Sequence, residues 1–191
     1  MILEIKQHFS AHVDTINQVA EQLSGNISAC VRLLADGLAA GNKLLVMGNG
    51  GSAADSQHMA AEFVGRFLME RKALPAIALT TDTSILTAVG NDYGYDEIFK
   101  RQVEALAQPG DLVLGISTSG NSGNIVRALE AAKALGCKTI GLLGRDGGAI
   151  APLVDLNLTV PVQDTPRIQE AHLTIIHILC DLVEKDLFGC R

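Results

Sequence analysis

The stretch KLLVMGNGGS, residues 43–52, places a short apolar run directly before a glycine-rich turn. A segment with helix-like spacing of apolar residues, 53–67, follows the turn. Strand, glycine turn and helix in this order are typical of the first unit of a parallel α/β sheet. Glycine in such a turn lets the backbone approach a ligand and adopt positive φ. Residues 43–52 therefore predict both the fold class and the place where a ligand binds.

The same pattern repeats along the chain from this stretch onward. Continuous apolar runs that alternate with helices indicate a parallel sheet covered on both faces. We therefore predict an α/β fold in which residues 1–191 form one domain with a five-stranded parallel sheet flanked by helices on both faces. The expected strands are 43–47, 76–79, 112–116, 139–143 and 156–160, and the helices between them are 53–67, 96–107 and 122–135.

The two ends of the chain are predicted to be helical. Apolar residues at steps of three or four predict one helix over 2–23 and a second over 27–38, which together make 1–41 an N-terminal helical extension. The last helix, 166–187, is apolar on more than one face, and such a helix is buried. Burial against another subunit would cover it, so we expect an oligomer that uses residues 1–41. The alternative is that the last helix packs within its own domain.

Composition excludes several classes of protein. The net charge is −6, Trp is absent, and no basic patch with stacking aromatics is visible, which argues against nucleic-acid binding. No apolar run reaches the roughly 18 residues of a membrane span, and the first residues lack the pattern of a signal peptide. We expect a cytoplasmic protein with no membrane contact. The four cysteines lack CxxC spacing, which argues against a disulfide framework and against a structural zinc site.

A second polar loop, Ser117-Thr118-Ser119-Gly120-Asn121-Ser122, follows the run 112–116. Ligands in open α/β sheets bind beyond the carboxyl ends of the strands, where both this loop and 48–52 lie. Its four hydroxyls and the free N–H groups of the next helix can bind a phosphate dianion without Lys or Arg. The alternative is that Ser and Thr only cap the helix and fill the turn.

A dinucleotide site is a competing interpretation of the first loop. Gly48, Gly50 and Ala53 fit the looser GxGxxA fingerprint, and Asp82 is the available acid for a ribose. Asp82 lies about thirty residues beyond the fingerprint, however, where about twenty is expected. The hydroxyl-rich loop 117–122 would also have no role in a dinucleotide site.

Three groups of residues could carry chemistry. His58 and Glu62 share one helix face and can bind a divalent metal or act as an acid–base pair, unless they form a solvated polar face. Asn91-Asp92 could hold sugar hydroxyls or form a turn. His177, among branched aliphatic residues of the last helix, is either a core histidine or a functional one.

Taken together, these residues resemble the phosphoheptose isomerase family over nearly the whole chain. The strings that carry the resemblance are Gly48–Ser52, His58 with Glu62, Gly90-Asn91-Asp92, Gly115–Ser122, and Arg167-Ile168-Gln169-Glu170 with His177. The resemblance implies an SIS fold, a homotetramer, and conversion of sedoheptulose 7-phosphate to D-glycero-D-manno-heptose 7-phosphate, an early step toward the heptose of lipopolysaccharide cores.

The resemblance also implies roles for individual residues. Glu62 would be the base for the carbon-bound proton, and His177 the acid–base group for the oxygens. One zinc ion per subunit would be held by His58, Glu62, Gln169 and His177. The substrate would contact residues of both loops and a few residues outside them. These are Asn49, Gly50, Gly51, Ser52, Glu62, Asn91, Asp92, Ser117, Thr118, Ser119, Ser122 and Gln169.

Helix geometry qualifies the implied zinc site. Gln169 and His177 are eight residues apart, roughly 12 Å along a continuous helix. Since helical side chains also lean toward the N-terminus, one helix does not easily bring both to one ion. Either the helix is interrupted, or the two residues reach the site from different subunits. We therefore expect active sites at subunit interfaces.

Two rival functions remain within the same fold. Close relatives of the family bind the bacterial replication initiator and lack an acid at the position of Glu62 and a histidine at that of His177. This sequence has both residues, which favours an enzyme. A sugar-phosphate-sensing SIS module is the third interpretation, although such modules usually accompany another domain.

Overall fold

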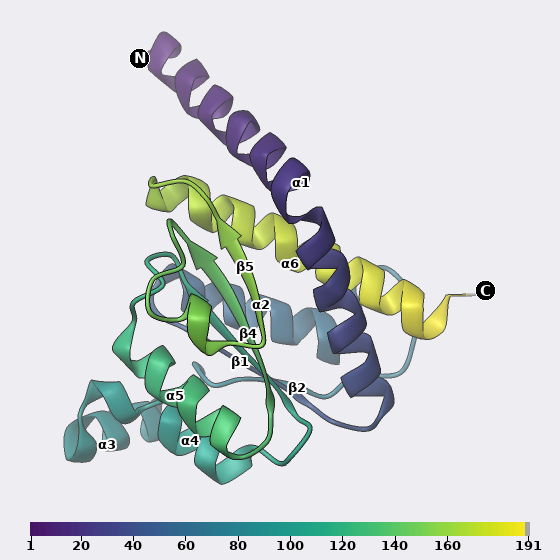
Figure 1. Ribbon diagram of the computed structural model, residues 1–191, viewed down its shortest axis with the longest axis vertical. Coiled ribbons are helices and arrows are strands. Elements are labelled where there is room, and N and C mark those ends of the chain that lie inside the picture. The colour runs from purple at the N-terminus through teal and green to yellow at the C-terminus, as the bar shows by residue number, and fades with distance from the viewer. Residues whose placement is uncertain (190–191) are drawn as a thin grey trace.

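The computed structural model describes residues 1–189, and its centre is a five-stranded sheet whose strands are all parallel. The spatial order is β2-β1-β3-β4-β5 (Figure 1). Each strand begins and ends within one residue of its predicted run, so the α/β prediction is confirmed. The strands are β1 (Leu44–Gly48), β2 (Ala76–Ala78), β3 (Leu112–Ser117), β4 (Lys138–Gly144) and β5 (Leu156–Val160).

Helices cover both faces of the sheet because successive strand residues point to opposite sides. Leu44 and Val46 of β1 enter the core beneath α1, α2 and α6, whereas Leu45 and Met47 enter the core beneath α4 and α5. Figure 1 shows the two groups of helices on opposite sides of the sheet. The helices are α1 (Ile2–Ala39), α2 (Gly51–Val64), α3 (Thr83–Tyr93), α4 (Lys100–Leu106), α5 (Gly123–Ala134) and α6 (Thr165–Phe188), with short 3₁₀ turns at Tyr95–Glu97 and Ala151–Leu153.

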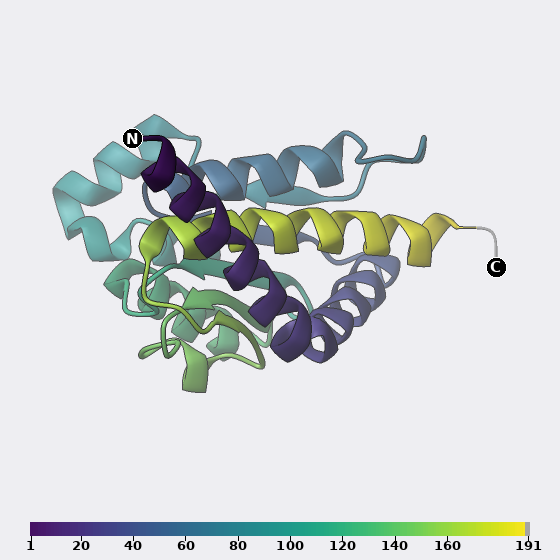
Figure 2. The same cartoon turned by 90° about the horizontal axis from the view of Figure 1, so that it is seen from above.

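The N-terminal region forms one helix, which corrects the prediction of two. Gly25 lowers helix propensity, and the bond from the Ser24 hydroxyl back to the Ala20 carbonyl weakens the helix slightly, yet α1 does not end here. Asn26 donates to the Asn157 carbonyl of β5 and anchors the helix beside the sheet. The helix changes direction part-way, and its first half projects from the body (Figures 1 and 2). Tertiary packing of the second half thus keeps α1 helical across residues of low helix propensity.

The projecting half of α1 exposes apolar side chains. Phe9 is 69% exposed and Val13 is 54% exposed. Ile2, Leu3 and Ile5 are exposed as well. Within residues 1–189, no segment buries this stripe.

Helix α6 is buried largely by its own chain, packing against α1, α2 and the sheet. The structure thus agrees with the alternative given above, in which the last helix packs within its own domain. Ile178 and Leu182 remain more than one-third exposed and form its outer apolar face. No helix within residues 1–189 combines the length and apolar character needed to cross a membrane.

A buried ion pair joins the end of α2 to α6. The carboxylate of Glu184 accepts hydrogen bonds from the backbone N–H groups of Phe67, Leu68 and Met69 at 2.7–2.9 Å, and from Arg71 Nε at 2.9 Å. Both charged side chains are almost fully buried. Burial alone would raise the pKa of Glu184, but the backbone donors and Arg71 outweigh it and the pKa is lowered.

Arg71 also closes the C-terminal end of α2. Its guanidinium donates to the carbonyl oxygens of Glu62 and Phe63 at 2.8 and 2.7 Å, and to those of Gly65 and Lys72. The last carbonyls of a helix lack intrahelical partners, so a cation here satisfies them. The pair therefore fixes where α2 ends relative to α6.

We predict that Glu184→Gln lowers the free energy of unfolding by about 3 kcal/mol, because it leaves a buried guanidinium without its counter-charge. Urea unfolding of the full chain measures this change. The control is Asp181→Asn, which removes an exposed pair with Lys185 and should change stability by less than about 1 kcal/mol. Equal effects of the two variants would contradict the role of the buried pair.

Candidate active site

The two predicted ligand loops leave adjacent strands, β1 and β3, at their carboxyl ends. The chain turns in opposite directions from these strands, toward β2 and toward β4, which makes this edge the topological switch point of the sheet. Gly50 adopts φ +57°, the left-handed region that favours glycine. A Cβ on Gly48 would lie 2.5 Å from the Ser52 carbonyl oxygen, so the turn can close only around glycine.

A pair of amide side chains ties the loops together. Asn49 and Asn124 each donate to the other's carbonyl oxygen at 2.9 Å. The Tyr95 hydroxyl also donates to Asn49, at 2.9 Å. Asn49 was expected to contact substrate, and in the structure its side chain joins the two loops. Asn124 is buried and was missed from the sequence, where an asparagine in the first turn of α5 carries no distinctive signal.

The hydroxyls of the second loop face one another at the start of α5. Ser117 Oγ lies 2.9 Å from Ser122 Oγ and 3.4 Å from Ser119 Oγ. Ser122 occupies the N-cap position, yet its side chain makes no capping hydrogen bond. The capping interpretation therefore fails for Ser122. Three hydroxyls gathered beside a helix N-terminus have the chemistry to bind an anion.

Gly120 allows this loop to pack closely on the loop after β4. Its φ is +68°, and a Cβ here would lie 2.2 Å from the Gly147 carbonyl oxygen. The Asn121 side chain accepts from the backbone N–H of Ala149 at 2.9 Å. Thr118, also expected to bind phosphate, is half-buried in the same turn.

The second part of the site lies where α2 meets α6, which run side by side in both views (Figures 1 and 2). His58 Nε2 of α2 is 2.9 Å from His177 Nε2 of α6. Glu62 Oε1 is 3.5 Å from the same His58 nitrogen. The Phe67 ring packs against His177, with ring centroids 5.5 Å apart. His177 is thus half-buried against an aromatic ring and His58, and the His58–Glu62 face contacts α6 instead of facing only solvent.

The donor chemistry of this cluster fits zinc. Two imidazole nitrogens and a carboxylate oxygen are common zinc ligands, and two nitrogens on one tetrahedral zinc lie about 3.3 Å apart. As placed, no three His, Cys, Asp or Glu side chains among residues 1–189 are arranged to hold a metal ion, and the two imidazole nitrogens contact each other directly. A separation larger by roughly 0.4 Å would suit the ion.

Gln169 lies nearer the start of α6 than His177 and faces the first half of α2. Its Nε2 is 3.4 Å from Asp55 Oδ2 of α2, and its amide sits against the backbone of Gly51. Helix α6 is continuous, so the interrupted helix considered from the sequence is wrong. Burial raises the pKa of the Asp55 carboxyl, and the Gln169 donor and the nearby His58 offset this only in part.

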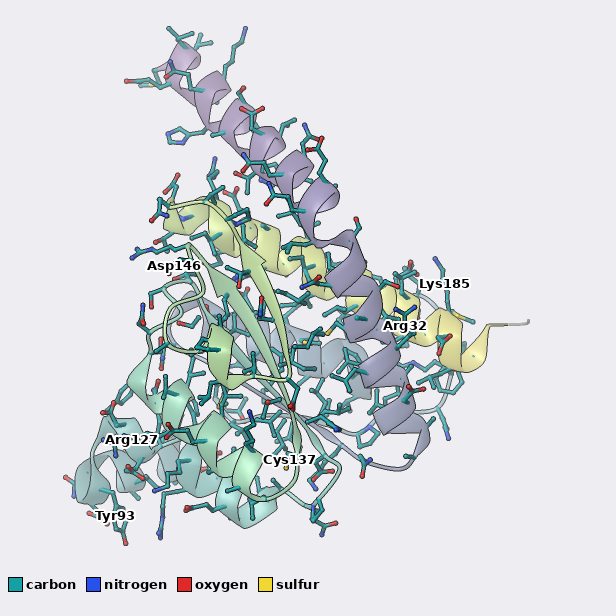
Figure 3. All side chains as sticks on the ribbon, viewed as in Figure 1. Arg32, Tyr93, Arg127, Cys137, Asp146 and Lys185 are labelled. Carbon is teal, nitrogen blue, oxygen red and sulfur yellow. The ribbon has the colours of Figure 1, made fainter. Side chains whose placement is uncertain are left out.

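Two predicted sugar contacts lie on α3. Asn91 and Asp92 are exposed in the last turn of α3 and bond to each other at 2.8 Å. Tyr93, next to them in sequence, points outward at the far end of α3 (Figure 3). Ser52 is buried in the first turn of α2. Asp82 caps α3 by accepting from the Ile85 N–H, which removes it as a ribose ligand and with it the dinucleotide interpretation.

Comparison with known proteins agrees with this arrangement. The sequence profile described as the SIS domain matches residues 7–144. A phosphoheptose isomerase from Geotalea daltonii is 66% identical over 191 residues, the full length of both chains. This chain belongs to the phosphoheptose isomerase family. Its Cys30, Cys137 and Cys180 are free and buried, while Cys190 lies outside the described residues.

Solved structures of phosphoheptose isomerases have the same fold. The protein from Neisseria gonorrhoeae superimposes with a TM-score of 0.92 at 43% identity, covering 97% of this chain and 100% of its own. The protein from Francisella tularensis gives a TM-score of 0.93 at 40% identity, covering 96% and 98%. The SIS fold expected from the sequence is therefore confirmed.

A buried histidine fixes α6 to the sheet beside the site. His172 is fully buried, and its Nε2 is 2.8 Å from the Leu143 carbonyl oxygen at the end of β4. Its Nδ1 has no hydrogen-bond partner. Burial lowers the pKa of His172 to about 4, against a smaller opposing effect of the Leu143 carbonyl. His172 is therefore neutral in the folded protein near neutral pH.

We predict that His172 makes the fold less stable in mild acid. The unfolded chain takes up a proton near pH 6.5 and the folded chain only near pH 4, so stability is complete above 6.5 and falls between these values. At pH 5 the loss relative to pH 7.5 is about 2 kcal/mol. The measurement compares urea unfolding of wild type and His172→Gln at both pH values. Parallel losses in the two proteins would contradict the prediction.

Proposed function

We propose that the chain is a cytoplasmic ketose–aldose isomerase that converts sedoheptulose 7-phosphate to D-glycero-D-manno-heptose 7-phosphate, the step that begins heptose synthesis for lipopolysaccharide. The observation that carries the proposal is the contact of His58 with His177, with Glu62 beside them. An acid–base cluster of this kind favours an enzyme over a non-catalytic regulator. The 66% identity to a phosphoheptose isomerase supports the choice of reaction.

The reaction moves a proton between two neighbouring carbons without an external oxidant. Glu62 takes the proton from C1, and the resulting enediolate receives it back at C2. His177 protonates the oxygen on C2 in the first half and takes the proton of the oxygen on C1 in the second. A carboxylate and an imidazole are suited to these transfers near neutral pH. Phe67 and His58 on either side of His177 hold its ring in place.

We propose that His58, Glu62, Gln169 and His177 hold one zinc ion per subunit. When bound, zinc would stabilise negative charge on the substrate oxygens as a Lewis acid. Glu62 then has two competing roles, since a carboxylate that binds a cation is a weaker base. The side chain of Glu62 is about one-quarter exposed, which leaves it accessible to a substrate.

The phosphate would bind at the loop after β3. Ser117, Ser119 and Ser122 present their hydroxyls together, and Thr118 lies in the same turn. The free N–H groups at the start of α5 add a partial positive charge. Since the protein carries a net charge of −6, such local donors have to supply the attraction. Asn49–Ser52, Asn91 and Asp92 would contact the sugar.

We further propose a homotetramer with active sites at subunit interfaces. The uncovered apolar stripe on α1, from Ile2 to Val13, supports self-association through residues 1–41. The position of Gln169, beside Asp55 and not beside His177, supports a site that a neighbouring subunit completes.

The activity prediction concerns the two catalytic residues. Glu62→Gln and His177→Ala should each lower kcat for sedoheptulose 7-phosphate by at least about 100-fold, because each removes a proton-transfer group. Glu130→Gln on the outer side of α5 is the matched control and should leave turnover unchanged. Robust turnover in either site variant would remove that residue from the mechanism. Unchanged wild-type turnover in the presence of a chelator would contradict the proposal that the enzyme uses zinc.

The assembly prediction concerns the apolar stripe. Phe9→Asp places a charge in the proposed interface and should lower the mass measured by analytical ultracentrifugation from that of a tetramer to that of a smaller species. Leu106→Asp changes a residue of similar type that is 40% exposed on α4, and it should leave the mass unchanged. A wild-type monomer, or a tetrameric Phe9→Asp protein, would contradict the proposal.

A further inference from the structure

Two tyrosines at the end of α3 make different contacts although they are two residues apart. Tyr93 points outward, and the guanidinium of Arg101 lies over its ring, 4.6 Å from the centroid (Figure 3). Tyr95 begins the 3₁₀ turn, and its hydroxyl donates to Asn49 Oδ1 at 2.9 Å. Gly94 between them has a φ of +92°, which lets the chain change direction. Only the second contact therefore reaches the glycine turn of the site.

Helix α3 is packed loosely at this edge of the sheet. No residue within Thr83–Tyr93 is buried, and Leu86 and Val89 are only partly covered by the core. A cavity of about 100 Å³ has Gly48 and Gly50 of the turn among its lining residues, together with Leu86 and Tyr95. Apolar packing between α3 and the turn is thus incomplete, which gives a direct polar contact more weight in holding the two segments together.

The hydroxyl of Tyr95 is the part of this side chain that makes a specific contact. The residue is 63% exposed, so the ring gains little from burial. Ile98 and Phe99, which follow closely in the chain, are each only 2% exposed and anchor this segment in the core. Tyr95 therefore extends from an anchored segment to Asn49, and the hydrogen bond fixes the distance between that segment and the turn.

Asn49 connects this contact to the second loop of the site. Its carbonyl oxygen accepts from both Tyr95 and Asn124, and its NH₂ group donates to Asn124. A carbonyl oxygen has two lone pairs, so both are occupied. Three hydrogen bonds thus hold one amide, and they join the end of α3, the glycine turn and the start of α5 into one unit.

We infer that Tyr95 is a positioning residue for substrate binding, which acts through Asn49 to hold the glycine turn against the end of α3. The inference rests on the proposed function, in which Asn49–Ser52, Asn91 and Asp92 contact the sugar. Asn91 and Asp92 precede Tyr95 by four and three residues, so one hydrogen bond holds both groups of sugar contacts in place. A site that is already ordered loses less freedom when its ligand binds, and affinity rises accordingly.

The test is Tyr95→Phe, which removes the hydroxyl and keeps the ring. The KM for sedoheptulose 7-phosphate and the Kd measured by calorimetric titration should both rise about 3- to 10-fold, the effect of one neutral hydrogen bond. The kcat should stay within about two-fold, because a group that only holds the binding site contributes no proton transfer. Inhibition by inorganic phosphate should also stay within about two-fold, because the Asn49–Asn124 pair and the serine hydroxyls remain.

Tyr93→Phe is the matched control, since it makes the same chemical change two residues away. Its ring can still stack with Arg101, and we expect KM, kcat and Kd within about two-fold of wild type. An equal loss of affinity in the control would overturn the inference, because the effect would then not belong to the Tyr95 contact. A Tyr95→Phe protein with a lower melting temperature and unchanged Kd would also overturn it, since the role would then be structural only.

A double-mutant cycle tests whether Tyr95 acts through Asn49. In an Asn49→Ala protein, Tyr95→Phe should cause no further loss of affinity, and the full loss in that background would overturn the inference while leaving the isomerase proposal intact. A wild-type chain that binds sedoheptulose 7-phosphate without converting it would refute the isomerase, and the Kd comparison would still decide the role of Tyr95. A wild-type chain that does not bind this sugar phosphate overturns both.

Discussion

The side chains between α2 and α6 are polar at three successive levels, and the chemistry of the site depends on how these helices are held together. Gln169 faces Asp55 near the start of both helices. Glu184 and Arg71 lock the end of α2 to α6 through a buried ion pair. His58 and His177 meet in the middle. Polar groups between packed helices are tolerated only when they are paired, so each level restricts how the helices can slide. The way α2 packs on α6 thus sets the distances among His58, Glu62 and His177.

The sheet supplies the other half of the site. The glycine turn after β1 starts α2, and the serine loop after β3 starts α5. One edge of the sheet therefore places the serine hydroxyls near the start of the helix that carries His58 and Glu62. The Asn49–Asn124 pair prevents the two loops from separating. This division suits a sugar phosphate, because its charged end and its reacting carbons are far apart. Under the proposed function, phosphate binding and proton transfer would therefore be performed by different elements.

Much of this arrangement could be predicted from the sequence, because apolar periodicity and glycine turns are local signals. The five strands, the two loops and the His58–Glu62 face all follow from such patterns. The pairing of Asn49 with Asn124, and of Glu184 with Arg71, joins residues that are 75 and 113 positions apart, and no local pattern reports it. The break expected near Gly25 failed for the opposite reason, since tertiary packing overrides a weak local propensity. Asp55 could have been predicted to lie beside the site, because it shares the helix face of His58 and Glu62.

The central claim is that His58 and Glu62 of α2 act together with His177 of α6 in one chain, and that a neighbouring subunit adds the remaining groups. Anomalous X-ray diffraction at the zinc absorption edge, from crystals of the zinc-loaded protein, tests it most directly. The account predicts a peak between α2 and α6, about 2.0–2.1 Å from Nε2 of both His58 and His177. A zinc peak elsewhere, with these two imidazoles still in direct contact, would contradict it.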